Sequence, residues 1–246
     1  MRKLIFASLV LLVVGSLLTS FLVVTNRAPT DPEAVQTKAK TACWLIQPYN
    51  PAVQMLASKI LMQTNRSDLW DSLGAMYRWV VLNIRYQTEP AGQDYWQTPT
   101  ETLSNGTGDC EDFAILLCSL VLAYNSSVPA ECVVIGSPVQ VAGLAGHVAV
   151  AIPFGNQITI LDPAGAWFTQ TGNVFFVKGG WAVAGGDGKV TKKPAEQEVA
   201  DWLRMWSNEM PDARITATFS MATEKNFDDT AAFLSWTAST TEGQTP

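Results

Sequence analysis

The sequence is poor in histidine, with His147 as the only one in 246 residues. A zinc site built from histidines and closely spaced cysteines is therefore not expected. Basic residues are also scarce, since 16 lysines and arginines face 22 acidic residues and leave a net charge of −6. Nucleic-acid binding depends on a basic surface, so we expect no nucleic-acid partner. Histidine-based proton transfer in this protein must use His147.

Cysteine is sparse as well, and four cysteines do not make a disulfide-rich scaffold. Cys118 follows Cys110 by about two helical turns, roughly 12 Å along a helix axis, which is too far for a direct bond between them. If a disulfide forms, it joins two of Cys43, Cys118 and Cys132. The sequence does not select the pair.

Charge and proline are absent from residues 4–24. As a helix, this run spans roughly 30 Å, the thickness of a bilayer core. It does not end in the small-residue pattern of a signal-peptidase site, so an uncleaved signal anchor is favoured over a cleaved signal peptide. We expect a transmembrane helix in residues 1–26, a linker at 27–40, one domain at 41–240 outside the cytoplasm and a polar tail at 241–246. Cleavage would instead make the domain a secreted protein.

Apolar periodicity and turn signals predict an α+β domain. Helices are expected over residues 51–62, 67–81, 98–103, 110–124, 194–210 and 228–236. Strands are expected over residues 84–86, 131–136, 146–153, 157–162, 173–177 and 215–221. The run 113–124 is apolar on nearly every face, which predicts a helix buried at the centre of the domain. Trp202 and Trp206 lie at helical spacing and are predicted to be core residues.

A glycine-rich turn leads into this central helix and places Cys110 at its N-terminus. Unpaired backbone N–H groups and the positive end of the helix macrodipole favour a thiolate there. Glu111 and Asp112 act in the opposite direction, because negative charges disfavour ionisation of a neighbouring thiol. A cysteine near a helix start is, taken alone, most often a small buried residue. A catalytic role for Cys110 therefore requires a nearby base that can take the thiol proton.

The only candidate base lies on a predicted hairpin that also carries Asp162. With a two-residue turn at 154–155, His147 faces Asp162 directly. With the turn at 155–156, Asp162 faces Ala149 and still shares a sheet face with His147, because side chains alternate with period two. Both registers predict a carboxylate near the imidazole.

Cys110, His147 and Asp162 thus appear in the order of a cysteine acyl-transfer triad on a helix and a hairpin. In this hypothesis Cys110 attacks a carbonyl carbon. His147 takes the thiol proton and returns one to the leaving group, while Asp162 orients the imidazole and stabilises its cation.

Three separated motifs strengthen this hypothesis. They are Gly-Asp-Cys-Glu-Asp-Phe-Ala at residues 108–114, Gly-His-Val at 146–148 and Leu-Asp-Pro-Ala at 161–164. Together they resemble the transglutaminase-like superfamily, and residues 95–103 resemble the lead-in of its prokaryotic branches. The resemblance implies a papain-like fold, in which the catalytic cysteine begins a central buried helix packed on an antiparallel sheet carrying the histidine and the aspartate. It also implies a thiol enzyme acting on amide bonds, as peptidase, amidase or, less often in prokaryotes, transamidase.

The oxyanion donor departs from the papain pattern. Papain-type enzymes place a glutamine six residues before the nucleophile, where this chain has Ser104. The Cys110 backbone N–H is the first alternative donor, and a side chain of Trp96 or Gln97 is the second.

The resemblance requires no cofactor, although related bacterial transglutaminase-like cysteine peptidases can bind calcium through acidic residues beside the nucleophile. Asp109, Glu111 and Asp112 are the candidate calcium ligands on that basis.

The function hypothesis is a membrane-anchored thiol hydrolase that acts on a protein or peptide through an acyl-enzyme intermediate. One alternative is a catalytically silent binding module at the cell surface, and another is a protein-crosslinking transamidase. The substrate is not encoded in a readable motif, because the candidate specificity loops at 87–97, 138–145 and 164–188 follow no known pattern.

Overall fold

The structure is a computed structural model that describes residues 42–62, 64, 68–89, 94–138, 146–165 and 190–240. The predicted anchor (1–26), linker (27–40), tail (241–246) and strand at 173–177 lie outside these residues. Within the described ranges, no helix has the length and apolarity needed to cross a membrane.

The first half of the domain is helical, and its helices begin at polar capping side chains. Asn50 and Asp68 accept backbone N–H groups at the starts of two helices, and Thr98 and Glu101 form the predicted capping box of a third. The elements are η1 (Cys43–Leu45), α2 (Pro51–Leu61), α3 (Leu69–Asn83), α4 (Pro99–Asn105) and α5 (Cys110–Tyr124). Two short parallel strands that the sequence did not predict as a pair, β1 (Arg85–Tyr86) and β2 (Thr107–Gly108), lie next to α4 and α5.

Helix α5 is the centre of the core. Its residues from Cys110 to Leu122 are all buried, which confirms the prediction from its uniformly apolar sequence. It packs against α2, α3 and α4 and against strands β3 (Glu131–Gly136) and β4 (Gly146–Phe154). Helix α5, with its first turn buried, therefore packs directly against the sheet.

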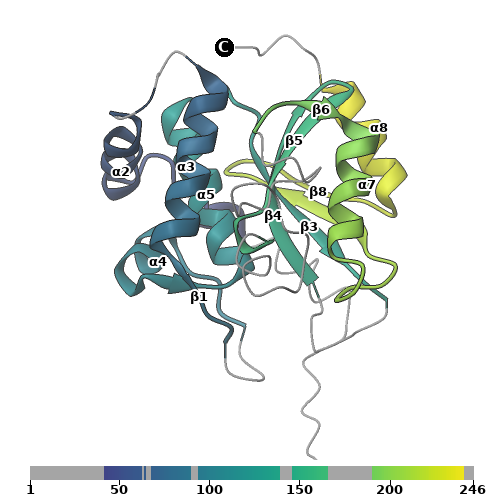
Figure 1. The fold of residues 1–246 in the computed structure, drawn as a ribbon, viewed down its shortest axis with the longest axis horizontal. Helices are drawn as coiled ribbons and strands as arrows, with labels where there is room; N and C mark the ends of the chain where they lie inside the picture. The colour runs from purple at the N-terminus through teal and green to yellow at the C-terminus, as the bar shows by residue number, and fades with distance from the viewer. Residues whose placement is uncertain are drawn as a thin grey trace, which may run out of the picture.

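The second half is a six-stranded antiparallel sheet in the order β6-β5-β4-β3-β7-β8. Its further strands are β5 (Gln157–Leu161), β6 (Lys193–Pro194), β7 (Arg214–Phe219) and β8 (Glu224–Asn226), of which β6 and β8 were not predicted. Helices α7 (Ala195–Met205) and α8 (Thr230–Ser239) complete the domain. In Figure 1, α2 to α5 gather on the left of the sheet, and α7 and α8 lie on its right. The predicted α+β class is confirmed.

The β4–β5 hairpin decides between the two predicted registers. Phe154 pairs with Gln157, so the turn is formed by Gly155 and Asn156, and the register with a turn at 154–155 is wrong. Gly155 has φ of 65°, a conformation that glycine adopts without the steric cost of a Cβ. The sheet alternation then places Asp162 on the same face as His147.

The four cysteines all lie in the part of the chain that the structure describes, and all are free thiols. Cys110, Cys118 and Cys132 are buried, and Cys43 is half-buried.

Candidate active site

His147 and Asp162 form a buried hydrogen-bonded pair. Imidazole Nε2 lies 2.8 Å from Asp162 Oδ2, and the two side chains are 1% and 0% exposed. Burial alone would raise the pKa of Asp162. The attraction of the His147 cation and the hydrogen bonds to the carboxylate outweigh burial and hold that pKa below its usual value. Asp162 is therefore an anion at neutral pH, Nε2–H donates the bond, and Nδ1 is the ring nitrogen left for another group.

The Asp162 carboxylate receives further donors from two other parts of the chain. The indole N–H groups of Trp202 and Trp206 donate to Oδ2 at 2.9 and 2.8 Å, and the backbone N–H of Gly165 donates to Oδ1 at 2.8 Å. Both tryptophans are fully buried, as predicted for core residues. Their role as donors was not predicted, because the only signal in the sequence was a spacing of four residues.

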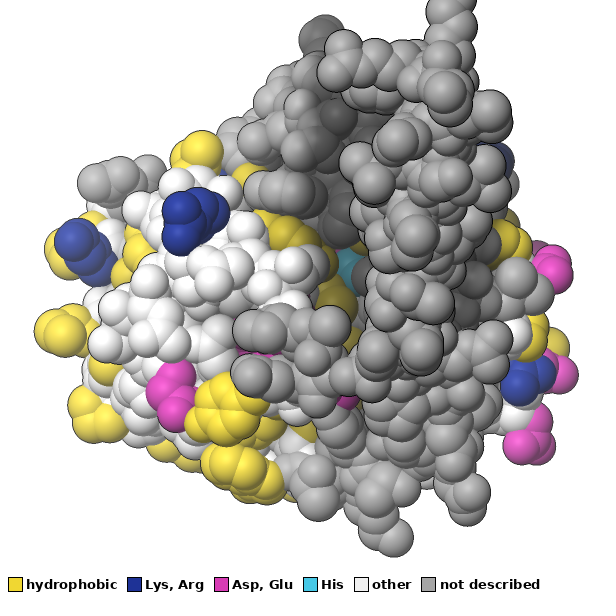
Figure 2. Space-filling view, turned by 90° about the horizontal axis from the view of Figure 1, so that it is seen from below, with side chains coloured by type: hydrophobic (Ala, Val, Ile, Leu, Met, Phe, Trp, Pro, Cys, Tyr) yellow, Lys and Arg dark blue, Asp and Glu magenta, His cyan; other side chains and the backbone are white. Residues whose placement is uncertain are grey.

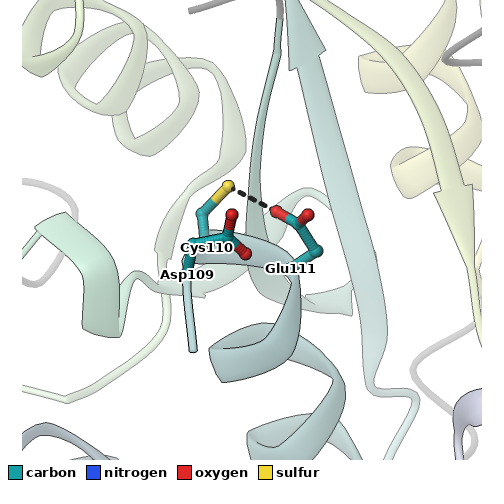
Figure 3. Close-up of side chains that lie close together, drawn as sticks. All are labelled: Asp109, Cys110 and Glu111. Carbon is teal, nitrogen blue, oxygen red and sulfur yellow. Dashed lines mark hydrogen bonds between the residues drawn. The ribbon is translucent and has the colours of Figure 1, made fainter. Parts of the chain in front are cut away.

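Cys110 is the first residue of α5 and is 7% exposed. Its thiol donates to Glu111 Oε2 at 3.0 Å rather than to the imidazole, and Figure 3 shows the sulfur and the Asp109 and Glu111 carboxyl groups together at the first turn of the helix. The backbone N–H of Val148, the residue after His147, lies close enough to the sulfur to lower the pKa of the thiol. The structure therefore brings Cys110 beside the strand that carries His147, while the thiol proton is engaged by Glu111.

The electrostatics of this turn favour the protonated thiol. Burial raises the pKa of Cys110 well above its usual value, and the negative charges of Glu111 and Asp109 raise it further. The backbone N–H of Val148 lowers this pKa but does not offset the other three effects. The sequence predicted that the helix N-terminus would lower the pKa of the Cys110 thiol and that its acidic neighbours would raise it. In this structure, the effect of burial and of the acidic neighbours is the larger one.

Asp109 is a half-buried carboxyl group that lacks a complete set of partners. Its Oδ1 atom is buried without a hydrogen-bond partner among the residues that the structure describes. Burial, followed by the charge of Glu111, raises the pKa of Asp109 to about 10. An oxygen in this condition needs either a proton or a cation.

Asp112 has a different environment, because Gln97 holds it. Its Oδ1 accepts the Gln97 backbone N–H at 2.7 Å, and its Oδ2 accepts the Gln97 side-chain amide at 2.5 Å. Burial raises the pKa of Asp112 to about 7, although the Gln97 hydrogen bonds lower it. Asp112 thus anchors the segment before α4 to the start of α5.

The two side chains predicted as secondary oxyanion donors have N–H groups that are already in use. The Gln97 amide donates to Asp112 and to the Thr107 carbonyl oxygen, and the Trp96 indole N–H donates to Asp94 at 2.8 Å. Their oxyanion role stays a prediction. The backbone N–H of Cys110, at a helix N-terminus, remains the first candidate.

The acidic groups around Glu111 fit a calcium ion. Ligand atoms of Asp109, Cys110 and Glu111 lie within 4.8 Å of one another, as do those of Glu89, Asp94 and Glu111. Carboxylate oxygens are the ligands that calcium prefers, and the unpartnered Asp109 Oδ1 gives one of them a reason to bind a cation. Asp112 belongs to neither group, and its part in binding calcium stays a prediction.

A small part of the imidazole reaches the surface. Figure 2 shows a small area of the histidine colour beside hydrophobic side chains, and His147 is the only histidine. Its exposure of 1% means that a substrate would meet only a small part of the ring.

Comparison with known families matches residues 52–178 to the model of the transglutaminase-like domain, which covers more than half of the chain. The chain belongs to the transglutaminase-like domain family. The matched residues of this transglutaminase-like domain include Cys110, His147 and Asp162.

Solved structures that match the chain share little sequence with it. Legionella pneumophila LapG is 17% identical with a TM-score of 0.45, and the match covers 82% of this chain and 91% of LapG. Calcium-bound LapG is 18% identical with a TM-score of 0.37, covering 78% and 93%. A proposed cysteine protease from Cytophaga hutchinsonii is 18% identical with a TM-score of 0.36, covering 71% of this chain and 48% of that protein. A comparison with curated proteins gives no match.

Proposed function

We propose that this protein is a thiol hydrolase that cleaves an amide or peptide bond in a protein or peptide through Cys110, His147 and Asp162. The observation that carries the proposal is the buried 2.8 Å bond between His147 Nε2 and Asp162, beside a cysteine at the N-terminus of α5. An imidazole with a fixed, ionised partner is pre-organised to accept and return one proton. Membership of the transglutaminase-like family supports the same chemistry.

The proposed reaction has two steps. Cys110 Sγ bonds to the substrate carbonyl carbon while its proton passes to His147 Nδ1, and the C–N bond then breaks as Nδ1 gives that proton to the leaving amine. Water next attacks the thioester, its proton passes through His147, and the C–S bond breaks to restore the thiol. An amine acceptor in place of water would give transamidation by the same steps.

We also propose calcium as a ligand of Asp109 and Glu111. The support is the unpartnered Asp109 oxygen, the carboxylate oxygens of Asp109 and Glu111 that lie within 4.8 Å of each other, and the calcium-bound form of LapG. When bound, calcium supplies positive charge beside the thiol. With its carboxylate bound to calcium, Glu111 would no longer accept the thiol proton of Cys110. Cys110 could then donate this proton to His147.

A catalytically silent binding module is the second candidate function. The bond from the Cys110 thiol to Glu111 favours it, because a thiol held by a carboxylate is a poor nucleophile. The two candidates differ in whether His147 controls the reactivity of Cys110.

Alkylation of the full chain tests this difference. Iodoacetamide labelling of Cys110 is followed by peptide mass spectrometry from pH 5 to pH 10, in calcium and in EGTA, with half-buried Cys43 as an internal reference. The enzyme proposal predicts that calcium makes Cys110 react faster than Cys43 below pH 8 and that His147→Ala lowers this rate at least tenfold. Labelling of Cys110 that is slower than that of Cys43 in both media and unaffected by His147→Ala would overturn it. Asp228→Asn, at an exposed acid of the same chain, is the matched control and should leave the rate unchanged.

We further propose that residues 1–26 hold the domain at the outer face of a membrane. The support is the uncharged run at residues 4–24. The full chain should stay with the membrane during alkaline extraction and be digested by a protease added outside the cell. Release into the supernatant would overturn the anchor, and protection from the protease would overturn the orientation.

A further inference from the structure

Two tryptophans of the second half of the chain converge on one carboxylate oxygen of the site. Trp202 lies on α7 and Trp206 directly follows it, so their spacing of four residues places both on one helical face. Asp162 Oδ2 accepts both indole N–H groups, at 2.9 and 2.8 Å, in addition to His147 Nε2 at 2.8 Å. A single oxygen therefore accepts three N–H groups from two separate elements.

The same two rings border the imidazole. The Trp206 ring centroid lies 3.8 Å from that of His147, with 37° between the planes, and the Trp202 centroid lies 6.2 Å away. Trp202, Trp206 and Asp162 are all 0% exposed. Water is thus excluded from the His147–Asp162 bond, and the imidazole plane is held by direct contact with an indole.

Packing alone does not account for this arrangement. A buried indole needs one hydrogen-bond acceptor of any kind, yet both indoles use the same ionised oxygen. Neutral donors hold a carboxylate in place without cancelling its charge, so Asp162 keeps the negative charge that stabilises an imidazolium. An indole face against the imidazole also favours the cation.

We infer that Trp202 and Trp206 are positioning residues of the Cys110–His147–Asp162 site: Trp202 fixes the Asp162 carboxylate toward Nε2, and Trp206 fixes both this carboxylate and the imidazole plane. Together they maintain the tautomer in which Nε2 carries the proton and Nδ1 is the ring nitrogen available to Cys110. The inference rests on the proposed function, because only a reacting thiol needs Nδ1.

The presence of one histidine makes the test direct, since nitrogen-15 histidine labelling of the full chain gives signals from His147 alone. The wild type should show the Nε2–H tautomer and a slowly exchanging Nε2–H proton at neutral pH. Trp206→Phe should speed this exchange at least tenfold and populate the Nδ1–H tautomer, and Trp202→Phe should speed exchange with a smaller change in tautomer. Trp236→Phe is the matched control, because the ring contacts of Trp236 among the described residues are with Phe227 and Phe233 and not with His147.

A second variant separates positioning from folding. Replacing Trp206 with benzothienylalanine keeps the bicyclic ring and removes only the N–H donor, so exchange should again accelerate while thermal stability changes little. Unchanged exchange and tautomer in folded Trp206 variants would overturn the inference and leave the alkylation test of the proposed function unaffected. Conversely, Cys110 could fail the alkylation test while the Trp206 variants still exchange the Nε2–H proton faster. That result would overturn the proposed function but not the positioning of His147 by the tryptophans.

Discussion

Neutralising Asp109 should stabilise the protein in the absence of divalent cations. The native carboxyl has a pKa of about 10, whereas in the unfolded chain the value is about 3.9. Because the native pKa is raised, the stability linked to this group is fully present below about pH 4 and is lost as the pH rises toward the native pKa. Each pH unit in this window lowers the free energy of unfolding by at most about 1.4 kcal/mol, which gives an upper limit of about 4 kcal/mol at pH 7.

Asp109→Asn removes this titration and retains the shape of the side chain. We expect the variant and the wild type to have similar free energies of unfolding at pH 4 in EGTA. The variant should then become the more stable by a few kcal/mol at pH 7. Urea unfolding at pH 4, 5.5 and 7 measures the difference, with Asp228→Asn as the control for an exposed aspartate.

The second half of this prediction concerns the stability of the two proteins in calcium. A cation that binds only the native wild type stabilises it by about 2.7 kcal/mol at one hundred times its dissociation constant, and Asp109→Asn should lose most of this gain. The reasoning is refuted if the variant is less stable than the wild type at pH 7 in EGTA, or if the difference between them is the same at all three pH values. A calcium effect of equal size in both proteins would exclude Asp109 as a ligand.

Three further outcomes follow from the same contacts. Asp162→Asn should destabilise by about 3 kcal/mol or more at pH 7, because it removes a buried anion whose Oδ2 accepts three N–H groups. Since the native pKa of Asp162 is lowered, the difference from the wild type should shrink as the pH falls below about 4 in urea titrations. Gln97→Ala should cost about 1–3 kcal/mol in the same assay by leaving the buried Asp112 carboxyl without its side-chain donor, with Gln54→Ala on the exposed face of α2 as control. Phe113→Ala should cost about 3–5 kcal/mol by opening a cavity beside the first turn of α5, read as a lower thermal midpoint; a change below about 1 kcal/mol would contradict the packing described for that turn.

The sequence determined the main features of this domain because they depend on local patterns. An apolar run too uniform for a surface helix predicted the buried α5, and the glycine turn before it placed Cys110 at the N-terminus of that helix. Period-two alternation across a short hairpin put His147 and Asp162 on one face in either register. The tight turn itself was decided by Gly155, whose positive φ a phenylalanine would adopt only under strain.

Only the tertiary structure decided which groups surround the proposed nucleophile and its base. Trp202 and Trp206 lie about forty residues from Asp162 in sequence, and no local pattern distinguishes an indole that packs in a core from one that also donates to a carboxylate. Asp109 and Asp112 are three residues apart and chemically identical. Asp109 is half-buried with an unpartnered oxygen, whereas Asp112 is buried and accepts two hydrogen bonds from Gln97. Tertiary packing decides how deeply each carboxyl group is buried and how many N–H donors reach it. The pKa values of Asp109, Asp112 and Asp162 therefore depend on contacts that cannot be read from the sequence.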